Sequence, residues 1–429
     1  MYTYFCQLNA DKNINYTGYQ KTLNLYETSF SFWDISSKRS NKYIFSQISS
    51  PILDLLYISS FVYLADCTSP RSQTITNWER NINLSIPVLN IELMNAIKPD
   101  LVAALNFLSG DYWQIEFRKR DYEETERYQL DKTKQLKIPE PFDCVSMLSG
   151  GLDSCIGAID LLEERKKPLF VGCHGRGASV KPYQNKVFSV LKNRYNLSNN
   201  CFKQFSLERN ANGQVGELTT RSRSFHFFMH GVAMADIYNV DQLIIPENGV
   251  ISLNVPLTYA RIGSSSTRTT HPYYMALLNT ILQKLGSSIR LINPYQFKTK
   301  GEMMSECKNQ EILSNVASLT MSCSHPSDRY SGEDCIKDSH CGYCVPCTIR
   351  RAAFKKSNII DNSIYRDPES EVARQNFRSF EIGILSKESI GAFDILKSGP
   401  IPDIANYPEY LNLYTRGIKE IKDYLSNDE

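Results

Sequence analysis

The stretch MLSGGLDSCIG, residues 147–157, places a serine and two adjacent glycines between two segments of regular structure. The preceding DCVSML is a short apolar run typical of a buried strand, and DSCIGAIDLLEER has the period of an amphipathic helix. Glycines at such a turn allow a ligand to approach the backbone, and the N-terminus of a helix offers unpaired N–H groups to an anion. The pattern predicts a phosphate-binding loop formed by Leu148, Ser149, Gly150, Gly151, Leu152, Asp153 and Ser154.

This loop differs from a Walker A loop because the ending GK[ST] is missing, and with it the lysine that binds the terminal phosphates. The carboxylate of Asp153 repels an anion unless a divalent cation lies between them. We therefore assign Asp153 to Mg²⁺ as a hypothesis. The structural alternative is a Gly-Gly turn in which Asp153 caps the helix.

The segments after the loop alternate between the two periods. PLFVGCH, FKQFSL and DQLIIPE have the pattern of strands, and they alternate with the expected helices PYQNKVFSVLKNRY and RSFHFFMHGVAMADIY. Such alternation favours a parallel sheet covered on both faces, with ligands at the carboxyl ends of the strands. Residues 142–360 are predicted to form this α/β domain.

The other regions are expected to differ from it. Residues 1–118 mix aromatic and β-branched stretches (MYTYFCQL, KTLNLYE, SFSFWDI, NINLSIPVLNI, YWQIEF) with two helical patterns, which suggests a small α+β domain. One of these patterns, SPILDLLYISSFVYLADC, contains Asp54 and Asp66 and is interpreted as a buried helix rather than a membrane span. Residues 119–141 are highly charged and predict a solvated linker. Residues 361–429 are predicted to be helical.

Composition and charge argue against some classes of partner. The 429 residues carry 48 Lys and Arg against 46 Asp and Glu, a net charge of +2, so nucleic acid is not expected as a partner. The start, MYTYFCQLNADKN, lacks a basic segment followed by an apolar one, so no signal peptide is predicted. We expect a cytoplasmic protein without membrane attachment.

Five of the twelve cysteines lie close together in the sequence. HCGYCVPC gives a C-x2-C-x2-C pattern from Cys341, Cys344 and Cys347, and either Cys323 or Cys335 can supply a fourth thiolate. Four thiolates predict a closed, tetrahedral, structural Zn²⁺ site. An iron–sulfur cluster uses the same ligands at similar spacing, and unligated core thiols are the structural alternative.

Several basic side chains are candidates for binding anions. Arg221 and Arg223 open an expected helix, where their charge opposes the helix dipole unless an anion lies near. Arg261, Arg268 and His271 lie in a polar insert, and Lys300 lies in FKTKGE. Each is otherwise a surface charge. His226 and His230, four residues apart on an apolar helix, are expected to be packed rather than to bind a metal.

Together the two motifs resemble a known family. SGGLDS resembles the PP-loop of the adenylating ATP pyrophosphatases, and TMSC…HCGYCVPCTIRR resembles the zinc segment of the 7-cyano-7-deazaguanine synthase (QueC) family. RSRSFHFF, IPENG and NPYQFKTKGEM stand in the same order as that family's corresponding segments. The resemblance covers roughly residues 142–355. The longer zinc segment, the insert after Asn248 and the extra terminal regions are more similar to the QueC-like proteins of antiphage defence systems such as Qat.

The resemblance implies a carbon–nitrogen ligase activity. ATP activates the carboxylate of 7-carboxy-7-deazaguanine or a close analogue, pyrophosphate leaves, and an amine displaces AMP to give an amide or, after a second round, a nitrile. It implies ATP, Mg²⁺ and Zn²⁺ as cofactors, with Cys323 as the fourth zinc ligand. The implied roles are catalytic for Asp153, Arg221 and Lys300, and substrate-binding for Arg223, Glu247, Asn248, Arg268 and His271.

Two other functions remain open from the sequence. One is a different PP-loop enzyme, such as a tRNA-modifying enzyme of the thiolation type, in which cysteines are catalytic or bind an iron–sulfur cluster. The other is a defence scaffold that binds nucleotide without turnover. Because residues 1–118 carry no catalytic motif, we expect them to recognise a protein partner encoded in a defence operon, whose amino group is a possible acceptor.

Overall fold

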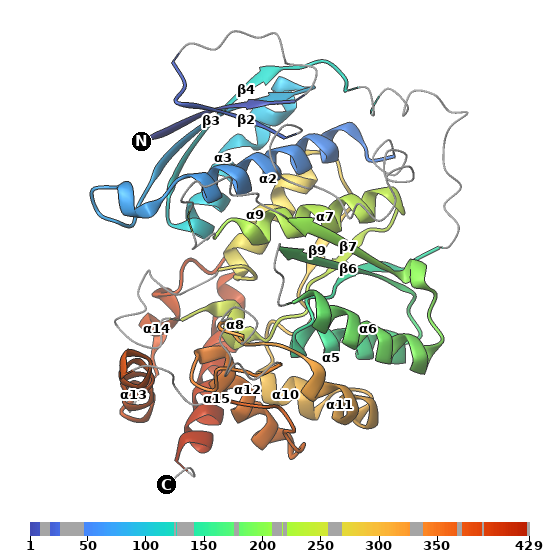
Figure 1. The fold of residues 1–429 in the computed structure, drawn as a ribbon, viewed down its shortest axis with the longest axis vertical. Coiled ribbons are helices and arrows are strands. Elements are labelled where there is room, and N and C mark those ends of the chain that lie inside the picture. The colour runs from blue at the N-terminus through green and yellow to red at the C-terminus, as the bar shows by residue number, and fades with distance from the viewer. Residues whose placement is uncertain are drawn as a thin grey trace, which may run out of the picture.

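The computed structural model describes residues 1–8, 18–25, 47–123, 126, 141–175, 180–207, 217, 221–255, 268–326, 338–366, 371–387 and 390–426. Within these residues, two parallel sheets are covered by helices, and a helical region follows at the C-terminus (Figure 1). Three features singled out in the sequence lie outside the described residues, namely SFSFWDI, Arg261 and Cys335.

The larger sheet is formed by the strand before the glycine-containing loop and the strands after it, and it is parallel, as predicted. Its strands run in the order β7-β6-β5-β8-β9, and every pair is parallel. The strands are β5 (Cys144–Met147), β6 (Pro168–Gly175), β7 (Phe202–Leu207), β8 (Gln242–Ile244) and β9 (Arg290–Ile292). The apolar run that predicted β5 is buried because this strand is central and has neighbours on both sides.

Four helices cover the two faces of this sheet. From β5 the chain moves through β6 to β7 in one direction, and β8 and β9 lie on the other side of β5. Because crossovers between parallel strands are right-handed, this reversal places the connecting helices on opposite faces. One face carries α5 (Leu152–Glu163) and α6 (Lys181–Tyr195), and the other carries α7 (Arg223–Ile237) and α9 (Pro272–Lys284) (Figure 1). The order reverses between β5 and β8, where ligands of such sheets bind.

The smaller sheet corrects the α+β prediction for residues 1–118. Its order is β2-β1-β3-β4 and all three pairs are parallel, so this part is also α/β. The strands are β1 (Tyr2–Gln7), β2 (Lys21–Asn24), β3 (Asn81–Val88) and β4 (Tyr112–Lys119), with helices α2 (Ser50–Thr68) and α3 (Ile91–Ser109) between them. The strands themselves lie where the sequence predicts them, and only their pairing differs, because pairing depends on residues far apart in the chain.

Helix α2 is buried, as its apolar sequence predicts. Its length and composition are sufficient to cross a membrane, yet 89% of the most apolar 18-residue window is buried inside the protein. Two aspartates interrupt the apolar surface, and each is paired. Asp54 accepts from Arg120 at 2.7 Å, and Asp66 accepts from Arg80 at 2.6 Å. We conclude that α2 is a core helix.

The two sheets are joined through their helices. Helix α2 packs on α7 and α3 packs on α9 (Figure 1). One continuous apolar core runs from Tyr4 of the first sheet to Leu291 of the second. Asp66 fixes this junction because its Oδ2 accepts from both the backbone N–H (2.8 Å) and the hydroxyl (2.7 Å) of Ser222, just before α7.

The charged segment 119–141 is only partly solvated where it begins: Lys119, Asp121 and Tyr122 are exposed, as predicted for a linker, while Arg120, Glu123 and Glu126 are buried. Arg120 and Glu126 are both buried and form an ion pair at 2.8 Å. Charged residues at this density indicated solvent exposure, but Arg120 contacts Asp54 inside the fold. Residues 124–125 and 127–140 lie outside the described residues.

The remaining elements complete the carboxyl edge of the larger sheet. Short helices α8 (Gly249–Leu253), α10 (Lys300–Ser305) and α11 (Gln310–Val316) lead to α12 (Val345–Ser357). The C-terminal region is helical, as predicted, with α13 (Glu371–Leu385), α14 (Ala392–Leu396) and α15 (Tyr407–Leu425). Helix α15 packs on α8 and α12.

The contacts at the junction between the two sheets predict that replacing the buried Asp66 lowers the free energy of unfolding more than replacing the partly exposed Asp100. Asp66→Ala leaves Arg80 short of one buried partner and removes the acceptor for Ser222, so we expect a loss of about 3–5 kcal/mol in the free energy of unfolding. Asp100→Ala removes a partly exposed 2.6 Å ion pair between α3 and Lys284 of α9 and is expected to cost about 0–1 kcal/mol. Urea denaturation measures both, and equal losses would contradict the role of Asp66.

Candidate functional site

The loop between β5 and α5 has a backbone that requires glycine. Gly150 has a φ of +83°, and a Cβ atom there would lie 2.8 Å from the backbone nitrogen of Gln184. Gly151 is the N-cap of α5. The two glycines therefore turn the chain sharply from the end of the central strand into the helix.

Hydroxyl groups surround this turn. The Oγ atoms of Ser149 and Ser154 lie 3.0 Å apart, and the N–H groups of Gly151 and Leu152 donate to Ser149 Oγ and Ser322 Oγ, both at 3.3 Å. A serine hydroxyl both donates and accepts hydrogen bonds. When a bound anion accepts from the N–H groups of the loop instead, the serine hydroxyls can rotate and donate to the anion as well. The arrangement suits the binding of phosphate oxygens.

Three segments bring polar side chains together beside the loop. Asp153 lies in the first turn of α5, Asn248 follows β8, and Lys300 is the first residue of α10. The Lys300 ammonium lies 2.6 Å from Asp153 Oδ1, and the side-chain and backbone N–H groups of Asn248 donate to Asp153 Oδ2 at 2.8 and 3.1 Å. These residues meet at the carboxyl edge of the sheet, next to the β5–β8 reversal.

The cluster contains a second carboxyl group with a different charge state. Burial opposes ionisation of Asp153, but the Lys300 ammonium outweighs it and lowers the pKa of Asp153 to about 2. Burial and the negative charge of Asp153 raise the pKa of Glu247 well above its ordinary value. Asp153 is therefore the ionised member of the pair, and Glu247 retains its proton into a higher pH range.

The contacts of Asp153 are with groups of the chain rather than with the predicted Mg²⁺, whose role at this residue stays a prediction. One carboxylate oxygen faces the Lys300 ammonium, and the other accepts two N–H groups of Asn248. A divalent cation needs oxygen ligands with lone pairs directed at it, and here a cation of the chain already neutralises the carboxylate. Asp153 orients Lys300 through this contact.

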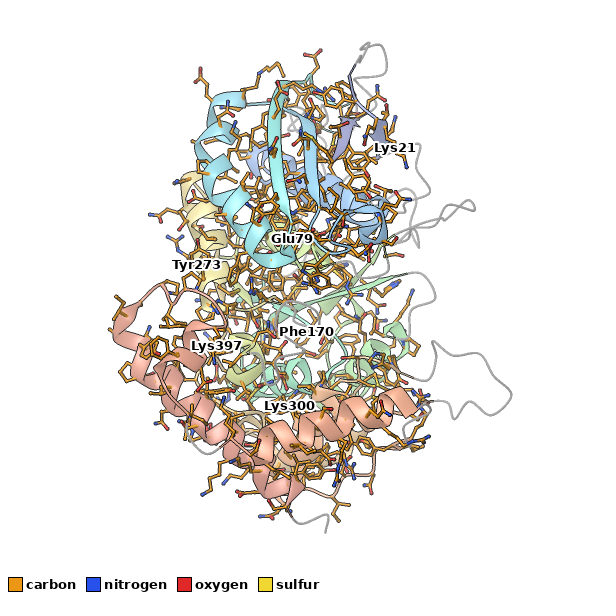
Figure 2. The ribbon with its side chains drawn as sticks, turned by 90° about the vertical axis from the view of Figure 1, so that its left-hand side faces the viewer. Lys21, Glu79, Phe170, Tyr273, Lys300 and Lys397 are labelled. Carbon is orange, nitrogen blue, oxygen red and sulfur yellow. The ribbon has the colours of Figure 1, made fainter. Side chains whose placement is uncertain are left out.

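Helix α15 holds the segment that carries Lys300, which the sequence did not reveal. Glu420 accepts from the hydroxyl of Thr299 at 2.6 Å and from the N–H of Gly301 at 3.0 Å, on either side of Lys300. Arg416 donates to Glu302 at 2.6 Å. Figure 2 shows Lys300 close to the C-terminal helices. The T-x-x-E capping box of Thr299 and Glu302 was the local signal for a helix starting at Lys300.

A second residue missed in the sequence positions Glu247. Asn293, directly after β9, donates to the carbonyl of Glu247 at 2.8 Å and accepts from its N–H at 3.3 Å. An asparagine that follows a strand at the carboxyl edge was the available signal. The ends of β8 and β9 are thereby fixed to each other.

The predicted arginines make their observed contacts away from Asp153. The Arg221 guanidinium lies 4.3 Å from the ring centre of Trp78, and burial lowers its pKa to about 10. Arg268 lies 4.5 Å from the ring centre of Phe107 and donates to the carbonyl of that residue at 3.0 Å. The structure therefore places Arg221 and Arg268 at the junction with residues 1–118, and not beside Lys300.

The remaining predicted basic residues have packing contacts. His271 caps α9: its Nδ1 accepts from Tyr273 N at 3.2 Å, and its Nε2 lies 3.2 Å from Ser398 Oγ. Burial lowers the pKa of His271 to about 3, which keeps the ring neutral. Arg223 lies over the ring of Phe227 at 5.4 Å. The two histidines of α7, His226 and His230, are buried against each other, in agreement with the sequence interpretation.

Four cysteines converge in front of α12. The sulfur atoms of Cys323, Cys341, Cys344 and Cys347 all lie within 4.8 Å of one another. Two of the pairs, Cys323–Cys344 and Cys341–Cys347, are separated by 4.0 and 3.9 Å. A tetrahedral zinc site with Zn–S bonds of about 2.3 Å needs sulfur atoms about 3.8 Å apart. This cluster can hold a metal ion such as zinc, and the predicted ligand Cys323 belongs to it.

Backbone N–H groups support the thiolates. Cys323 Sγ accepts from the N–H groups of His325 and Cys341, both at 3.2 Å, and Cys341 Sγ accepts from Cys344 N at 3.3 Å. Such donors orient metal ligands and favour their ionised form.

The cysteine cluster and the glycine loop are linked directly. Met321 N donates to the carbonyl of Gly150 at 2.9 Å, and Ser322 Oγ accepts from Leu152 N. Cys323 follows immediately. A metal ion that fixes Cys323 therefore also fixes the strand-like segment that packs against the loop.

Comparison of the chain with models of known protein families gives no match, and comparison with curated proteins finds no similar sequence. The interpretation of the site therefore depends on its motifs and its geometry.

Removal of one cluster thiol is expected to remove the metal. Cys344→Ser should purify with less than a tenth of the bound metal and with a lower melting temperature, because metal binding is coupled to folding of this segment. Cys201→Ser changes a cysteine outside the cluster and should retain the metal. Elemental analysis of both proteins tests this, and a fully loaded Cys344→Ser protein would exclude Cys344 as a ligand.

The raised pKa of Glu247 predicts a dependence of stability on pH. The folded protein holds a proton on Glu247 that the unfolded chain has released above about pH 4.3, so stability falls as the pH rises. Relative to Glu247→Gln, the unmodified protein should lose up to about 1.4 kcal/mol per pH unit between pH 5 and 7. Urea unfolding at several pH values measures the difference.

Glu302→Gln is the control for this experiment. Although burial opposes it, Arg416 lowers the pKa of Glu302. The ionised Glu302 therefore stabilises the folded protein at every pH above the ordinary pKa of a glutamate. The effect of Glu302→Gln on the free energy of unfolding should be constant between pH 5 and 7. A constant difference for Glu247→Gln as well would contradict the raised pKa.

Proposed function

We propose that this protein is an ATP-dependent ligase that adenylates the carboxylate of 7-carboxy-7-deazaguanine, or of a close analogue, and transfers the acyl group to an amine. The observation that carries the proposal is the placement of the Ser-Gly-Gly turn. It joins the central strand β5 to α5 at the reversal of strand order, with Lys300 beside it. The resemblance of SGGLDS and of the cysteine segment to the QueC family gives the substrate class.

The proposed reaction joins two anions, so the site has to offset their repulsion. An oxygen of the substrate carboxylate attacks the α-phosphorus of ATP, a new O–P bond forms, and pyrophosphate leaves with the electron pair of the broken bond. The amine nitrogen then forms a bond to the acyl carbon, AMP leaves, and solvent takes up the protons released by the amine. The N–H groups of the loop supply the positive potential for the first step, and the ammonium of Lys300, whose charge Asp153 balances, is a hydrogen-bond donor beside them.

Asp153 and Glu420 have supporting roles in this proposal. Asp153 pairs with Lys300 and keeps its ammonium at a fixed position at the sheet edge. Glu420 holds the residues on both sides of Lys300 and is a positioning residue rather than a catalytic one. A site in which such charges are fixed before the substrate arrives requires little reorganisation during the reaction.

We assign zinc to the cysteine cluster, with a structural role. Four thiolates at near-tetrahedral distances leave no coordination position for water, so the metal stabilises the segment next to the loop. The alternative PP-loop enzyme of the thiolation type has catalytic cysteines or an iron–sulfur cluster. Metal analysis separates the two, because our proposal requires one zinc and no iron per chain.

For the acceptor we propose the amino group of a partner protein, and for the setting antiviral defence. Support for a binding surface comes from β4, where Tyr112, Gln114 and Glu116 face outward while Trp113, Ile115 and Phe117 are buried. The acceptor is tested by mass spectrometry of partner proteins after the reaction, which looks for the added deazaguanine acyl group. Because α2 and α3 share the core with α7 and α9, the test uses the intact chain rather than one from which residues 1–118 have been deleted.

The activity is tested by measuring pyrophosphate. The protein, with ATP, magnesium and 7-carboxy-7-deazaguanine, should release pyrophosphate, and release should depend on the carboxylate substrate. The double variant Asp153→Asn/Lys300→Met removes both charges of the buried pair and so avoids an unpaired buried charge. It should fold and lose at least about 100-fold in rate, the usual cost of removing a group that stabilises developing charge.

Lys308→Met is the matched control. Lys308 pairs with Glu164 on the exposed surface, and its replacement should leave the rate unchanged. If the double variant keeps its rate, Lys300 has no part in the chemistry. If the unmodified protein releases no pyrophosphate while it binds ATP, the nucleotide-binding scaffold is the better interpretation.

A further inference from the structure

A cavity of about 290 Å³ lies between the carboxyl end of β9 and the C-terminal region. One wall comes from α9 and from the end of β9, including Met275, Asn279 and Asn293. The other comes from the segment that leads into α15, including Asp403 and Tyr410. Its volume is close to the lower limit, about 300 Å³, of typical small-molecule sites, and its position at the carboxyl edge of a parallel sheet is where such sites form.

The walls of this cavity are fixed by hydrogen bonds. Asn279 donates to the carbonyl of Leu291 at 3.1 Å and accepts from its N–H at 2.8 Å. Asn293 binds the backbone of Glu247 on its other side. Tyr410 donates to Gln296 at 3.3 Å. The cavity is therefore formed in advance of any ligand and shares Asn293 with the candidate active site.

The charge of the lining differs from that of the loop. Among the described residues that line the cavity, Asp403 is the charged one, and lysine and arginine do not occur among them. Asp403 is exposed at the rim of the cavity, and its carboxylate accepts from Ala405 N at 3.0 Å and from Asn406 Nδ2 at 3.2 Å, which leaves its charge without a cationic partner among the lining residues. Next to it, Met275, Ala276 and Leu291 offer apolar surface. This lining disfavours phosphates and carboxylates.

We infer that this cavity binds a primary amine, with the ammonium at Asp403 and the carbon chain along Met275, Ala276 and Leu291. A cation on an aliphatic stem matches a single carboxylate at the edge of an apolar wall. The role of this cavity rests on the proposed function, since the proposed ligase needs an amine as its second substrate. The wall formed by residues 402–410 lies outside the part of the chain that resembles the QueC family.

Direct binding of n-butylamine tests the inference without ATP or turnover. Saturation-transfer NMR on the full-length protein should detect n-butylamine and a lysine-containing tripeptide with acetylated N-terminus, but not butyrate or 1-butanol at the same concentrations. If n-butylamine alone binds, the source is a free amine; if the peptide also binds, the cavity accepts a protein side chain. Either result supports an amine site, and equal signals for butyrate would overturn it.

Two variants locate the binding. Asp403→Asn keeps an N-cap side chain for the short turn that follows and removes the charge, so binding of n-butylamine should weaken about fivefold, as expected for a solvent-accessible ion pair. Ala276→Leu reduces the volume and should abolish binding of the amine while leaving Asp403 intact. Asp241→Asn, which changes an exposed aspartate before β8, is the control and should have no effect.

The same samples separate this inference from the proposed function. Amine binding that is weakened in Asp403→Asn and lost in Ala276→Leu supports the cavity even if no pyrophosphate is released from ATP. Pyrophosphate release without any amine signal, or with an amine signal unchanged in both variants, overturns the cavity assignment and leaves the adenylation proposal intact.

Discussion

The buried ion pair between Asp153 and Lys300 is the interaction on which the arrangement of the site depends. Two charges removed from water cost several kcal/mol each, and only close geometry with additional hydrogen bonds offsets that cost. Asn248 provides those bonds to Asp153, and Glu420 fixes the backbone around Lys300. The pair therefore requires that α5, the end of β8, α10 and α15 occupy fixed positions relative to one another.

This requirement explains why the C-terminal region belongs to the same structure as the α/β part. Helix α15 shares an apolar cluster with α8, which begins directly after Asn248, and its polar face binds the residues around Lys300. A helix that contacts two of the three segments of the site acts as a scaffold for both. The cysteine cluster has the corresponding role on the other side of the loop, through Met321 and Ser322.

The sequence predicted the features that depend on neighbouring residues and missed the contacts between residues that are far apart in the chain. The strand, the glycine turn and the helix at residues 144–163 follow from adjacent residues, and the cysteine cluster follows from a spacing within one short segment. The pairing of β1 between β2 and β3 and the burial of Arg120 against Asp54 depend on residues about 20 to 80 positions apart, which leave no periodic signal. The pairing of Asp153 with Lys300 was missed for the same reason, because Lys300 lies far along the chain.

Charge is distributed along the carboxyl edge of the larger sheet in a way that suits two substrates of opposite sign. At the β5–β8 reversal the loop N–H groups offer hydrogen bonds to an anion and the charges of Lys300 and Asp153 balance each other, while the cavity at the end of β9 has the carboxylate of Asp403 and no basic lining residue among those described. Glu247 and Asn293 lie between the two regions and are hydrogen-bonded to each other. Under the proposed function, the exposed carboxylate of Asp403 disfavours an anionic substrate in the cavity, while the loop N–H groups favour one at the reversal. Under the proposed function, the order of the strands thus separates the two binding regions, one at the β5–β8 reversal and one at the end of β9.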